Sequence, residues 1–424
     1  MNRAQDIVII GGGAAGFFAA IHASEAEASS NDEASPELIR KASKVTGRVI
    51  ILEKTTKLLS KVKVSGGGRC NVTHDCDYPN QLVKFYPRGE KTLKRSFSKF
   101  DVNDTRKWFE RRGVKLKTEA DGRVFPISDN SQTIIDCLMK EVEEKGIEIR
   151  TNSEVTELTP LEKGYELKLK GGDTMMAEKV IVTVGGYPKS DSYQWLRNLG
   201  LKIVEPVPSL FTFNVPDSDM KDLQGLSVEK GMVSVPGSKW KDDGPILITH
   251  WGFSAPAVIK LSAWAAIDLH SRNYRFPIHI NWTRESEEVV RSALQEMRKN
   301  HPTKQIGSNP LFDIPKRLWE RLCQKAEIPE TLRYADFPAK TMNRFIEILV
   351  RCPYQVDGKT TFKEEFVTAG GVDLSEVDLS TFESKKHPGL FFAGEVLNAD
   401  GVTGGYNFQH AWTSGYLAGN SASV

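Results

Sequence analysis

The chain has few cysteines, and they follow no recognisable pattern. Five cysteines stand at positions 70, 76, 137, 323 and 352 of a 424-residue chain, and no CxxC pair occurs. A disulfide framework or a zinc ribbon would need regular spacings, so we predict neither and expect no metal site. Such cysteine usage suits a reducing compartment, so we expect a cytoplasmic protein.

Long apolar runs and a charge excess are also lacking. No apolar run approaches the ~18 residues of a membrane span, and the opening MNRAQDIVII has no signal-peptide cleavage site. The 57 basic and 55 acidic residues nearly cancel, leaving a net charge of +2. No membrane partner is therefore predicted, and nothing in the whole-chain charge favours nucleic acid. The length predicts more than one domain, and the oligomeric state stays open.

Glycine, by contrast, is clustered, first directly after an expected strand. The β-branched run Asp6–Ile10 is typical of a buried parallel strand, and a helical pattern follows the glycines. The turn has GxGxxG spacing and consists of Gly11, Gly13, Ala14, Ala15 and Gly16. Its first glycine permits the tight turn, its second lets the backbone approach a pyrophosphate, and its third lets the helix pack closely. We predict dinucleotide binding, with a phosphate-free turn as the alternative.

A second expected strand, Arg48–Leu52, ends at an acidic residue, Glu53. A carboxylate there would bind the hydroxyls of an adenosine ribose, although a solvated strand-end charge is the alternative. The usual gap is about 20 residues, and here it is longer. We interpret the polar stretch 24–47 as an insertion on the surface.

The segment after Glu53 is basic and then rich in glycine. Such a segment suits a cofactor whose second half lies along bare backbone, which favours FAD. The residues predicted to contact it are Lys54, Lys61, Ser65, Gly66, Gly67, Gly68, Arg69, Cys70 and Asn71. Arg69 would donate hydrogen bonds, and Asn71 would offer its amide to the ring edge or to a substrate carbonyl. Cys70 has no second cysteine close enough for disulfide chemistry, so we expect it to pack as a small apolar residue.

The end of the chain is predicted to return to the same site. A strand at Leu390–Ala393 leads into Gly394 and Glu395, whose acid would bind the ribityl hydroxyls. The TGGYN segment then opens a helix whose N–H groups would face the N1–C2=O edge of the flavin. Its predicted contacts are Gly404, Gly405, Tyr406 and Asn407. In the middle of the chain, Val155 would contact adenine, and Thr183, Gly185 and Gly186 mark where the chain leaves the nucleotide domain.

Together these segments resemble the YhiN/BaiN-like family of flavoproteins, which are NAD(P)/FAD-dependent oxidoreductases. The resemblance is carried by GGGAAG, SGGGRCNVT, GRVFPISD, THWGFSAPAV, FVTAGGV and FFAGEVLNADGVTGGYNFQHAW, which occur in that order. It implies an α/β fold with a Rossmann-like FAD-binding domain built from both chain ends (1–190 and 366–424). It also implies a β-barrel-like insertion (191–277 and 336–365) and a small helical insertion (278–335). We expect mixed strands over 336–365. The chain departs from the family pattern at Leu59-Ser60 and at Val184, which leaves the substrate side of the site less defined than the FAD side.

Two side chains are candidates for catalysis. His250, beside Trp251 where a strand meets a loop, could be a general acid or a substrate contact, and a purely structural histidine is the alternative. Asn407 is the second candidate. His410, one turn further along the same helix, is expected on the helix surface.

The predicted activity is that of an FAD-dependent oxidoreductase that transfers a hydride between a small organic substrate and an electron partner. GxGxxG occurs once, and we assign it to FAD. NAD(P)H is therefore the candidate electron partner only as a transient reductant, for which the chain provides no separate nucleotide-binding fold. A flavin-dependent RNA-modifying protein and an FAD-binding redox sensor without turnover are the alternatives. The basic stretch from Lys91 to Arg112 is interleaved with acids, so we interpret it as a solvated helix face and expect no nucleic-acid partner.

Overall fold

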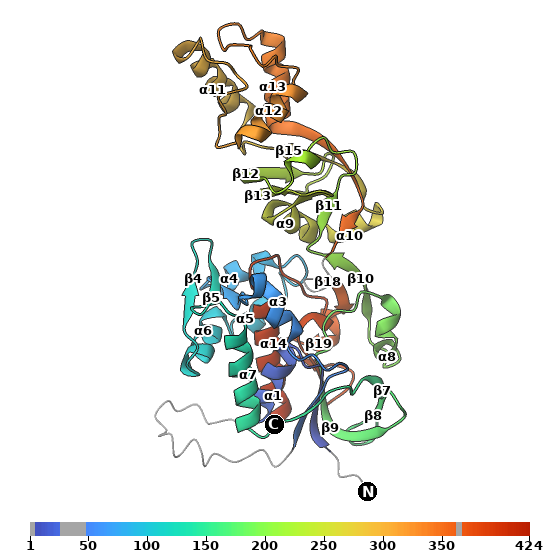
Figure 1. The fold of residues 1–424 in the computed structure, drawn as a ribbon. Helices are drawn as coiled ribbons and strands as arrows, with labels where there is room; N and C mark the ends of the chain where they lie inside the picture. Colours follow the sequence, from blue (N-terminus) through green and yellow to red (C-terminus); the bar gives the residue numbers. More distant parts are fainter. Residues whose placement is uncertain (1–4, 26–47, 362–366) are drawn as a thin grey trace. The chain divides into compact units, whose positions relative to one another are not determined.

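The computed structural model describes residues 5–25, 48–361 and 367–424, so the expected surface insertion lies outside the described residues from residue 26 onward. The chain forms two compact units (Figure 1). Unit 1 comprises Met1–Pro208 and Lys363–Val424, and unit 2 comprises Ser209–Phe362. Unit 1 is therefore built from both ends of the chain. The predicted border at 190/191 is not the border of these units, because the chain leaves unit 1 only after Pro208.

The core of unit 1 is a parallel sheet with the strand order β21-β9-β1-β2-β6. The strands are Leu390–Phe392 (β21), Thr174–Val182 (β9), Gln5–Ile10 (β1), Val49–Leu52 (β2) and Glu148–Arg150 (β6). From Ile7 to Ile10 every side chain of β1 is buried, as in a parallel strand covered on both faces. Parallel strands end at the same edge, so the segments that follow β1, β9 and β21 come together there.

Antiparallel strands extend this sheet. They are Val155–Pro160 (β7) and Tyr165–Leu169 (β8), which continue from β9, and Glu383–Ser384 (β20) and Val377–Asp378 (β19), which continue from β21. β8 and β9 form an antiparallel hairpin. Between β6 and β7 the chain turns at Asn152, which has a φ of 52°.

Two helices from opposite ends of the chain pack against each other in unit 1. They are α1 (Ala14–Ala23) and α14 (Tyr406–Ser423), and Figure 1 shows them side by side. Glycines permit the contact: a Cβ on Gly415 would lie 2.8 Å from the Ala15 carbonyl oxygen, and one on Gly419 would lie 2.4 Å from that of Ala19. This packing holds the middle of α14 beside the start of α1.

Short elements complete unit 1. The helices are α3 (Ser60–Gly68), α4 (Pro79–Leu82), α5 (Lys94–Phe97), α6 (Val102–Arg111), α7 (Gln132–Glu144) and α8 (Gln194–Arg197). A three-stranded sheet has the order β3-β5-β4, with bounds Thr73–His74 (β3), Arg123–Pro126 (β5) and Leu116–Thr118 (β4). A separate pair consists of β10 (Ile203–Ser209) and β18 (Val367–Val372). Among the described residues, no helix has both the length and the apolar character needed to cross a membrane.

Unit 2 is organised around a seven-stranded antiparallel sheet with the order β16-β15-β12-β13-β14-β11-β17. In chain order the strands are Thr212–Asn214 (β11), Ser227–Ser234 (β12), Lys241–Ile248 (β13), Gly252–Ser254 (β14), Arg275–Asn281 (β15), Cys352–Asp357 (β16) and Lys359–Thr360 (β17). The two edge strands, β16 and β17, are separated only by Gly358. The sheet must therefore curl until its edges meet, which is the predicted barrel-like form.

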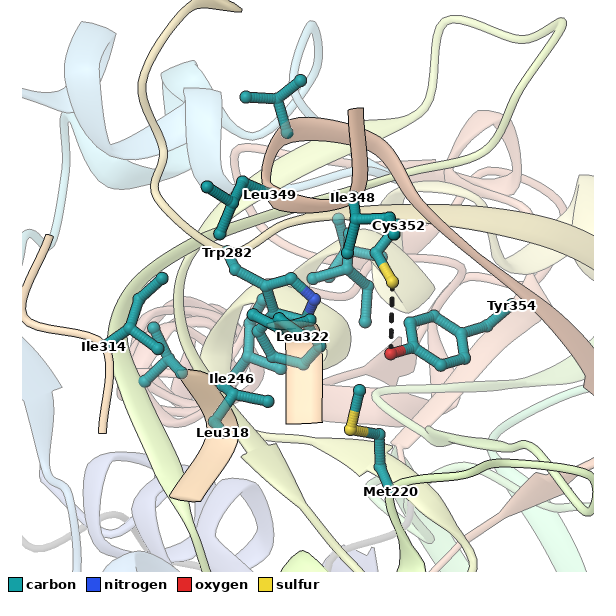
Figure 2. Packing of buried hydrophobic residues seen from close by; sticks show 14 of the residues in the cluster. Met220, Ile246, Trp282, Ile314, Leu318, Leu322, Ile348, Leu349, Cys352 and Tyr354 are labelled. Carbon is teal, nitrogen blue, oxygen red and sulfur yellow. Dashed lines mark hydrogen bonds between the residues drawn. The ribbon is translucent and has the colours of Figure 1, made fainter. Parts of the chain in front are cut away.

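Helices cover this sheet and share its core. They are α9 (Pro256–Trp264), α10 (Ala266–Ser271), α11 (Glu287–Asn300), α12 (Lys316–Lys325) and α13 (Ala339–Arg351). Figure 2 shows Leu322 of α12 and Leu349 of α13 packed around Trp282, which is fully buried. The helical segment therefore belongs to the same compact unit as the barrel.

The prediction of mixed strands over 336–365 is wrong for most of that segment, because 339–351 is the helix α13. The apolar residues Met342, Phe345, Ile346 and Leu349 recur at helical spacing and are all buried. The apolar residues of this segment recur with the helical period of 3.6 residues and not with the strand period of 2.

Candidate functional site

The GxGxxG turn joins β1 to α1 and is built as predicted. Gly11 has a φ of 119°, and a Cβ there would lie 2.5 Å from the Thr183 carbonyl oxygen. A Cβ on Gly16 would lie 1.9 Å from the Gly11 carbonyl oxygen. The Thr183 hydroxyl lies within hydrogen-bond distance of the carbonyl oxygens of Ile10 and Gly11, at 3.0 and 2.9 Å. Thr183, which follows the neighbouring strand β9, therefore stabilises the backbone of the turn.

Gly13 differs from its neighbours because a Cβ there would meet nothing within 4 Å. It is the N-cap of α1, and no side chain caps that helix. The N–H groups of the first turn of α1 are thus available to an anion, as a pyrophosphate site requires. Ala14 and Ala15 form this first turn, and Ala15 also packs against Gly394.

Glu53 follows β2 and holds the same turn. Its carboxylate accepts hydrogen bonds from the backbone N–H groups of Gly12 and Thr55 and from the Thr55 hydroxyl, all at 2.9 Å. A carboxylate has about four acceptor sites, so about one remains for a ribose hydroxyl. Ser153 donates its N–H to the Glu53 carbonyl oxygen at 2.8 Å, so the segment leading to Val155 lies beside Glu53. Lys54 instead lies over the ring of Tyr187, 5.2 Å from its centroid.

The SGGG segment is a left-handed turn at the end of α3. Gly66, Gly67 and Gly68 have φ values of 59°, 70° and 83°, which only glycine adopts readily. A Cβ on Gly67 or Gly68 would meet nothing within 4 Å, whereas one on Gly66 would lie 2.8 Å from the Phe125 ring. Gly67 and Gly68 therefore present bare backbone, and Gly66 is required by packing within the protein. Ser65, which begins this turn, accepts the Cys70 N–H with its carbonyl oxygen at 3.0 Å.

Cys70 and Asn71 follow the turn and are both buried. Burial raises the pKa of the Cys70 thiol to about 12, so it stays protonated and is unsuited to thiol redox chemistry. The side-chain oxygen of Asn71 is buried and has no hydrogen-bond partner among the described residues. Such an oxygen is costly unless a ligand or a water satisfies it, which suits the predicted contact of Asn71 with the flavin.

Glu395 lies where several segments of unit 1 meet. It forms an ion pair with Lys61, and its Oε1 accepts the Thr368 N–H at 2.9 Å. A Cβ on Gly186 would lie 2.9 Å from that same Oε1. The preceding residue, Gly394, has a φ of 75° and donates its N–H to the Ser414 hydroxyl at 2.9 Å.

Gly185 also has a φ of 75°, and nothing lies within 4 Å of a Cβ there. Gly185 thus presents open backbone directly before Gly186, which lies close to Glu395 and its ion-pair partner Lys61.

The TGGYN segment contacts the SGGGRCN segment directly. A Cβ on Gly405, which has a φ of 97°, would lie 2.6 Å from the Thr73 carbonyl oxygen and 2.9 Å from Asn71 Oδ1. Asn407 binds the backbone of Gly401 at both ends of its amide, accepting at 2.8 Å and donating at 2.9 Å. The visible role of Asn407 is thus to hold the loop before α14, and its part in catalysis stays a prediction.

Aromatic side chains surround this loop, and sequence reasoning missed two of them. Tyr406 stacks on His74 and on Phe85, each with ring centroids 4.6 Å apart. His74 Nδ1 lies 3.0 Å from the Gly404 carbonyl oxygen, and burial lowers the pKa of His74. The position of His74 directly after SGGGRCNVT was a signal for it. Phe85, which is 38% exposed, belongs to no motif.

The remaining histidines lie in different settings. His250 is exposed in the turn between β13 and β14 of unit 2, with its ring edge-on to Trp251 at 4.3 Å. His250 and Asn407 thus belong to different units, and their joint role in catalysis stays a prediction. The expectation of a surface position for His410 is wrong: it is 2% exposed, and burial lowers its pKa to about 4. Most of α14 is buried, so its helical pattern offered no exposed face.

These residues fit FAD. Open backbone at Gly13, Gly67, Gly68 and Gly185 lies among two carboxylates, a free helix N-terminus and an unsatisfied amide oxygen. Their separation along several strand ends suits an elongated dinucleotide with a flat ring. Within the described ranges, no three His, Cys, Asp or Glu side chains cluster in a way that could hold a metal ion.

Comparison with known proteins agrees with this geometry. The chain is 29% identical over 421 residues to the ribosomal RNA dihydrouridine synthase of Escherichia coli K12, covering 97% of this chain and 96% of that protein. It is 26% identical over 432 residues to the 3-dehydro-bile acid delta(4,6)-reductase of Clostridium scindens, covering 100% and 99%. Among solved structures, the 3-ketosteroid-delta4-(5alpha)-dehydrogenase of Rhodococcus jostii RHA1 matches with a TM-score of 0.53 at 13% identity, covering 100% and 97%. That likeness concerns the fold alone.

A family model described as the HI0933-like protein Rossmann domain matches residues 38–421. The resemblance drawn from the motifs is confirmed, and with it the Rossmann-like FAD-binding fold. The chain belongs to the HI0933-like family of FAD-dependent oxidoreductases.

Proposed function

We propose that the protein is an FAD-dependent reductase that acts on a carbon–carbon double bond conjugated to a carbonyl in a small organic substrate. The observation that carries the proposal is the open backbone at Gly13, Gly67, Gly68 and Gly185, where a Cβ would meet nothing within 4 Å, which suits FAD. FAD, when bound, supplies the hydride chemistry. The high pKa of Cys70 removes the thiol that a disulfide reductase would need.

The choice of substrate class rests on the two named relatives. A dihydrouridine synthase acts on a uracil ring, and a bile acid delta(4,6)-reductase acts on an unsaturated 3-oxo steroid acid. Both names describe saturation of a double bond conjugated to a carbonyl. The chain is aligned with each relative over nearly its full length, which supports the same bond type here.

The protein's own groups would orient the substrate and supply a proton. Asn71 Oδ1 is the buried acceptor beside the predicted ring site. His250, exposed at a strand end of unit 2, is the proposed proton donor, because reduction of a conjugated double bond needs a proton at the carbon next to the carbonyl. Asn407 would keep the Gly401–Gly405 loop in place.

NAD(P)H is the proposed reductant. The described residues contain one GxGxxG turn, and FAD is assigned to it, so NAD(P)H would dock transiently where the substrate later binds. Sharing of one space implies a ping-pong sequence in which each half-reaction proceeds without the other ligand.

The test is an anaerobic experiment on the flavin-loaded protein. We expect NADH or NADPH alone to bleach the flavin absorbance, and an unsaturated 3-oxo steroid added afterwards to restore it. A His250→Gln variant should be reduced normally and reoxidised more slowly. If neither nicotinamide nor any conjugated carbonyl compound changes the spectrum, the reductase proposal is wrong, and an FAD-binding sensor would account for the fold.

RNA modification is the second candidate, favoured by the similarity to the ribosomal RNA dihydrouridine synthase. Exposed basic side chains do occur around α5 and α6, at Lys91, Lys94, Arg95, Lys99, Lys107 and Arg111. Reoxidation by uridine-containing ribosomal RNA but not by the steroid would favour this candidate. RNA binding that weakens steeply with added salt would support it further.

A further inference from the structure

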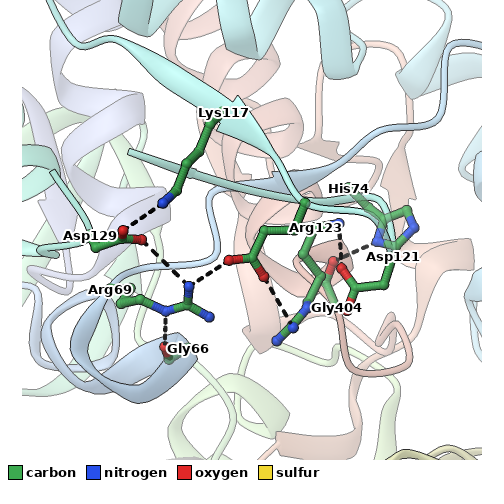
Figure 3. Close-up of polar contacts among 9 residues, drawn as sticks. Gly66, Arg69, His74, Lys117, Asp121, Arg123, Asp129 and Gly404 are labelled. Atoms are coloured by element: carbon green, nitrogen blue, oxygen red, sulfur yellow. Dashed lines mark hydrogen bonds and ion pairs between the residues drawn. The ribbon is translucent and has the colours of Figure 1, made fainter. Parts of the chain in front are cut away.

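The Arg69 guanidinium lies against the glycine turn and is held there by carboxylates from other segments (Figure 3). Its Nη1 lies 2.6 Å from Glu119 Oε1 and 3.4 Å from Asp129 Oδ1. Its Nε donates to the Gly66 carbonyl oxygen at 3.4 Å. The arginine thus links the backbone of the turn to the hairpin formed by β4 and β5.

The same guanidinium stacks on an aromatic ring. Its central carbon lies 3.9 Å from the centroid of Phe125, a buried residue of β5. The Phe125 ring is also the group that a Cβ on Gly66 would strike. Phe125 therefore contacts both Arg69 and the turn. A planar guanidinium can stack and form a fork of hydrogen bonds at once, which a lysine ammonium cannot do.

The carboxylates around Arg69 have further cationic partners. Lys117 donates to Asp129 at 2.5 Å, and Arg123 donates to Glu119 at 3.2 Å. The hydrogen bond from Lys117 lowers the pKa of Asp129, and the hydrogen bond to Glu119 raises the pKa of Arg69. Both groups therefore stay charged at ordinary pH, and the contacts persist.

This network surrounds a backbone conformation that needs support. Three successive glycines in the left-handed region can readily adopt other conformations, because glycine is the most flexible residue. Ser131 fixes one side of the turn by donating its N–H to the Gly68 carbonyl oxygen at 2.9 Å. Arg69 fixes the other side through Gly66.

We propose that Arg69 is a positioning residue of the flavin site: it holds Gly67 and Gly68 in the shape that the cofactor needs without contacting the cofactor. This replaces the prediction that Arg69 binds FAD directly. The inference rests on the assignment of FAD to this turn and not on the identity of the substrate.

The test measures the FAD dissociation constant of the full-length chain stripped of flavin, by titration with FAD and detection of fluorescence quenching. We expect Arg69→Lys and Arg69→Gln to weaken binding by a similar factor of about ten. Glu119→Gln should weaken binding less, and the double variant Arg69→Gln/Glu119→Gln should bind no more weakly than Arg69→Gln alone, because both changes break one network. The matched control is Arg275→Gln, which removes an ion pair with Asp357 in unit 2 and should leave FAD binding unchanged.

Two results would overturn the proposal. Wild-type affinity in Arg69→Lys would mean that positive charge alone matters, as in a direct contact with phosphate. Additive losses in the double variant would mean that Arg69 and Glu119 act separately. Circular dichroism of each variant without flavin checks that the chain is folded. If Arg69→Gln does not fold, the FAD dissociation constants of Arg69→Lys and Glu119→Gln still decide the question. The titration contains no substrate, so a result that overturns the role of Arg69 does not bear on the proposed reaction.

Discussion

A Gly16→Val variant should purify without flavin and should be markedly less stable than the natural chain. The new Cβ would lie 1.9 Å from the Gly11 carbonyl oxygen and 2.7 Å from the Thr183 hydroxyl, and backbone cannot yield as a flexible side chain can. Overpacking of a buried site typically costs about 1–3 kcal/mol, and a contact this short should reach or exceed that range. The flavin content after purification and the denaturant midpoint measure the two effects.

Leu322→Ala is the control for lost stability alone. Leu322 is fully buried in the core of unit 2, and its truncation should cost about 2–5 kcal/mol. We expect this variant to retain flavin. If Gly16→Val kept a full complement of flavin, the turn from β1 to α1 would not be the pyrophosphate site.

A Gly67→Val variant should bind flavin at least about 100-fold more weakly than the natural chain while remaining folded. Its side chain would project into the open space beside the turn, where the cofactor is expected. Gly405→Val would be a poorer probe, because its Cβ would strike Thr73 and the fold itself would suffer. Flavin titration of the stripped protein gives the affinity, and thermal unfolding reports the fold.

Gly113→Val is the matched control for backbone strain. Gly113 has a φ of 83°, close to the 70° of Gly67, and a Cβ there also meets nothing within 4 Å. It follows α6 and belongs to no predicted cofactor contact. The two variants should lose similar stability, but only Gly67→Val should lose flavin. Equal flavin affinity in the two variants would contradict the placement of the cofactor beside Gly67.

Most of the nucleotide half of the site was accessible from the sequence, because backbone geometry imposes residue types there. Gly11 and Gly16 are required by contacts shorter than any side chain permits, and Gly67 by its left-handed conformation. Such requirements leave a visible pattern in the chain. The apolar run of β1 likewise shows a strand covered on both faces.

Other features depend on packing partners far away in the sequence, which no local pattern reveals. The carboxylate partners of Arg69, Glu119 and Asp129, lie 50 and 60 residues further on and carried no signal of their own. His410 looked exposed because burial of α14 depends on α1, from the other end of the chain. Helix α13 was missed for a different reason: its apolar spacing was present, but it was read with the wrong period.

The central claim is that the two ends of the chain build one FAD site. The most direct measurement is to release the cofactor from the purified protein by heat and identify it by chromatography, with quantification against the protein concentration. We predict FAD in a ratio approaching one per chain, because Glu53 is proposed to bind an adenosine ribose that FMN does not have. Recovery of FMN, or of no flavin after reconstitution with FAD, would contradict it.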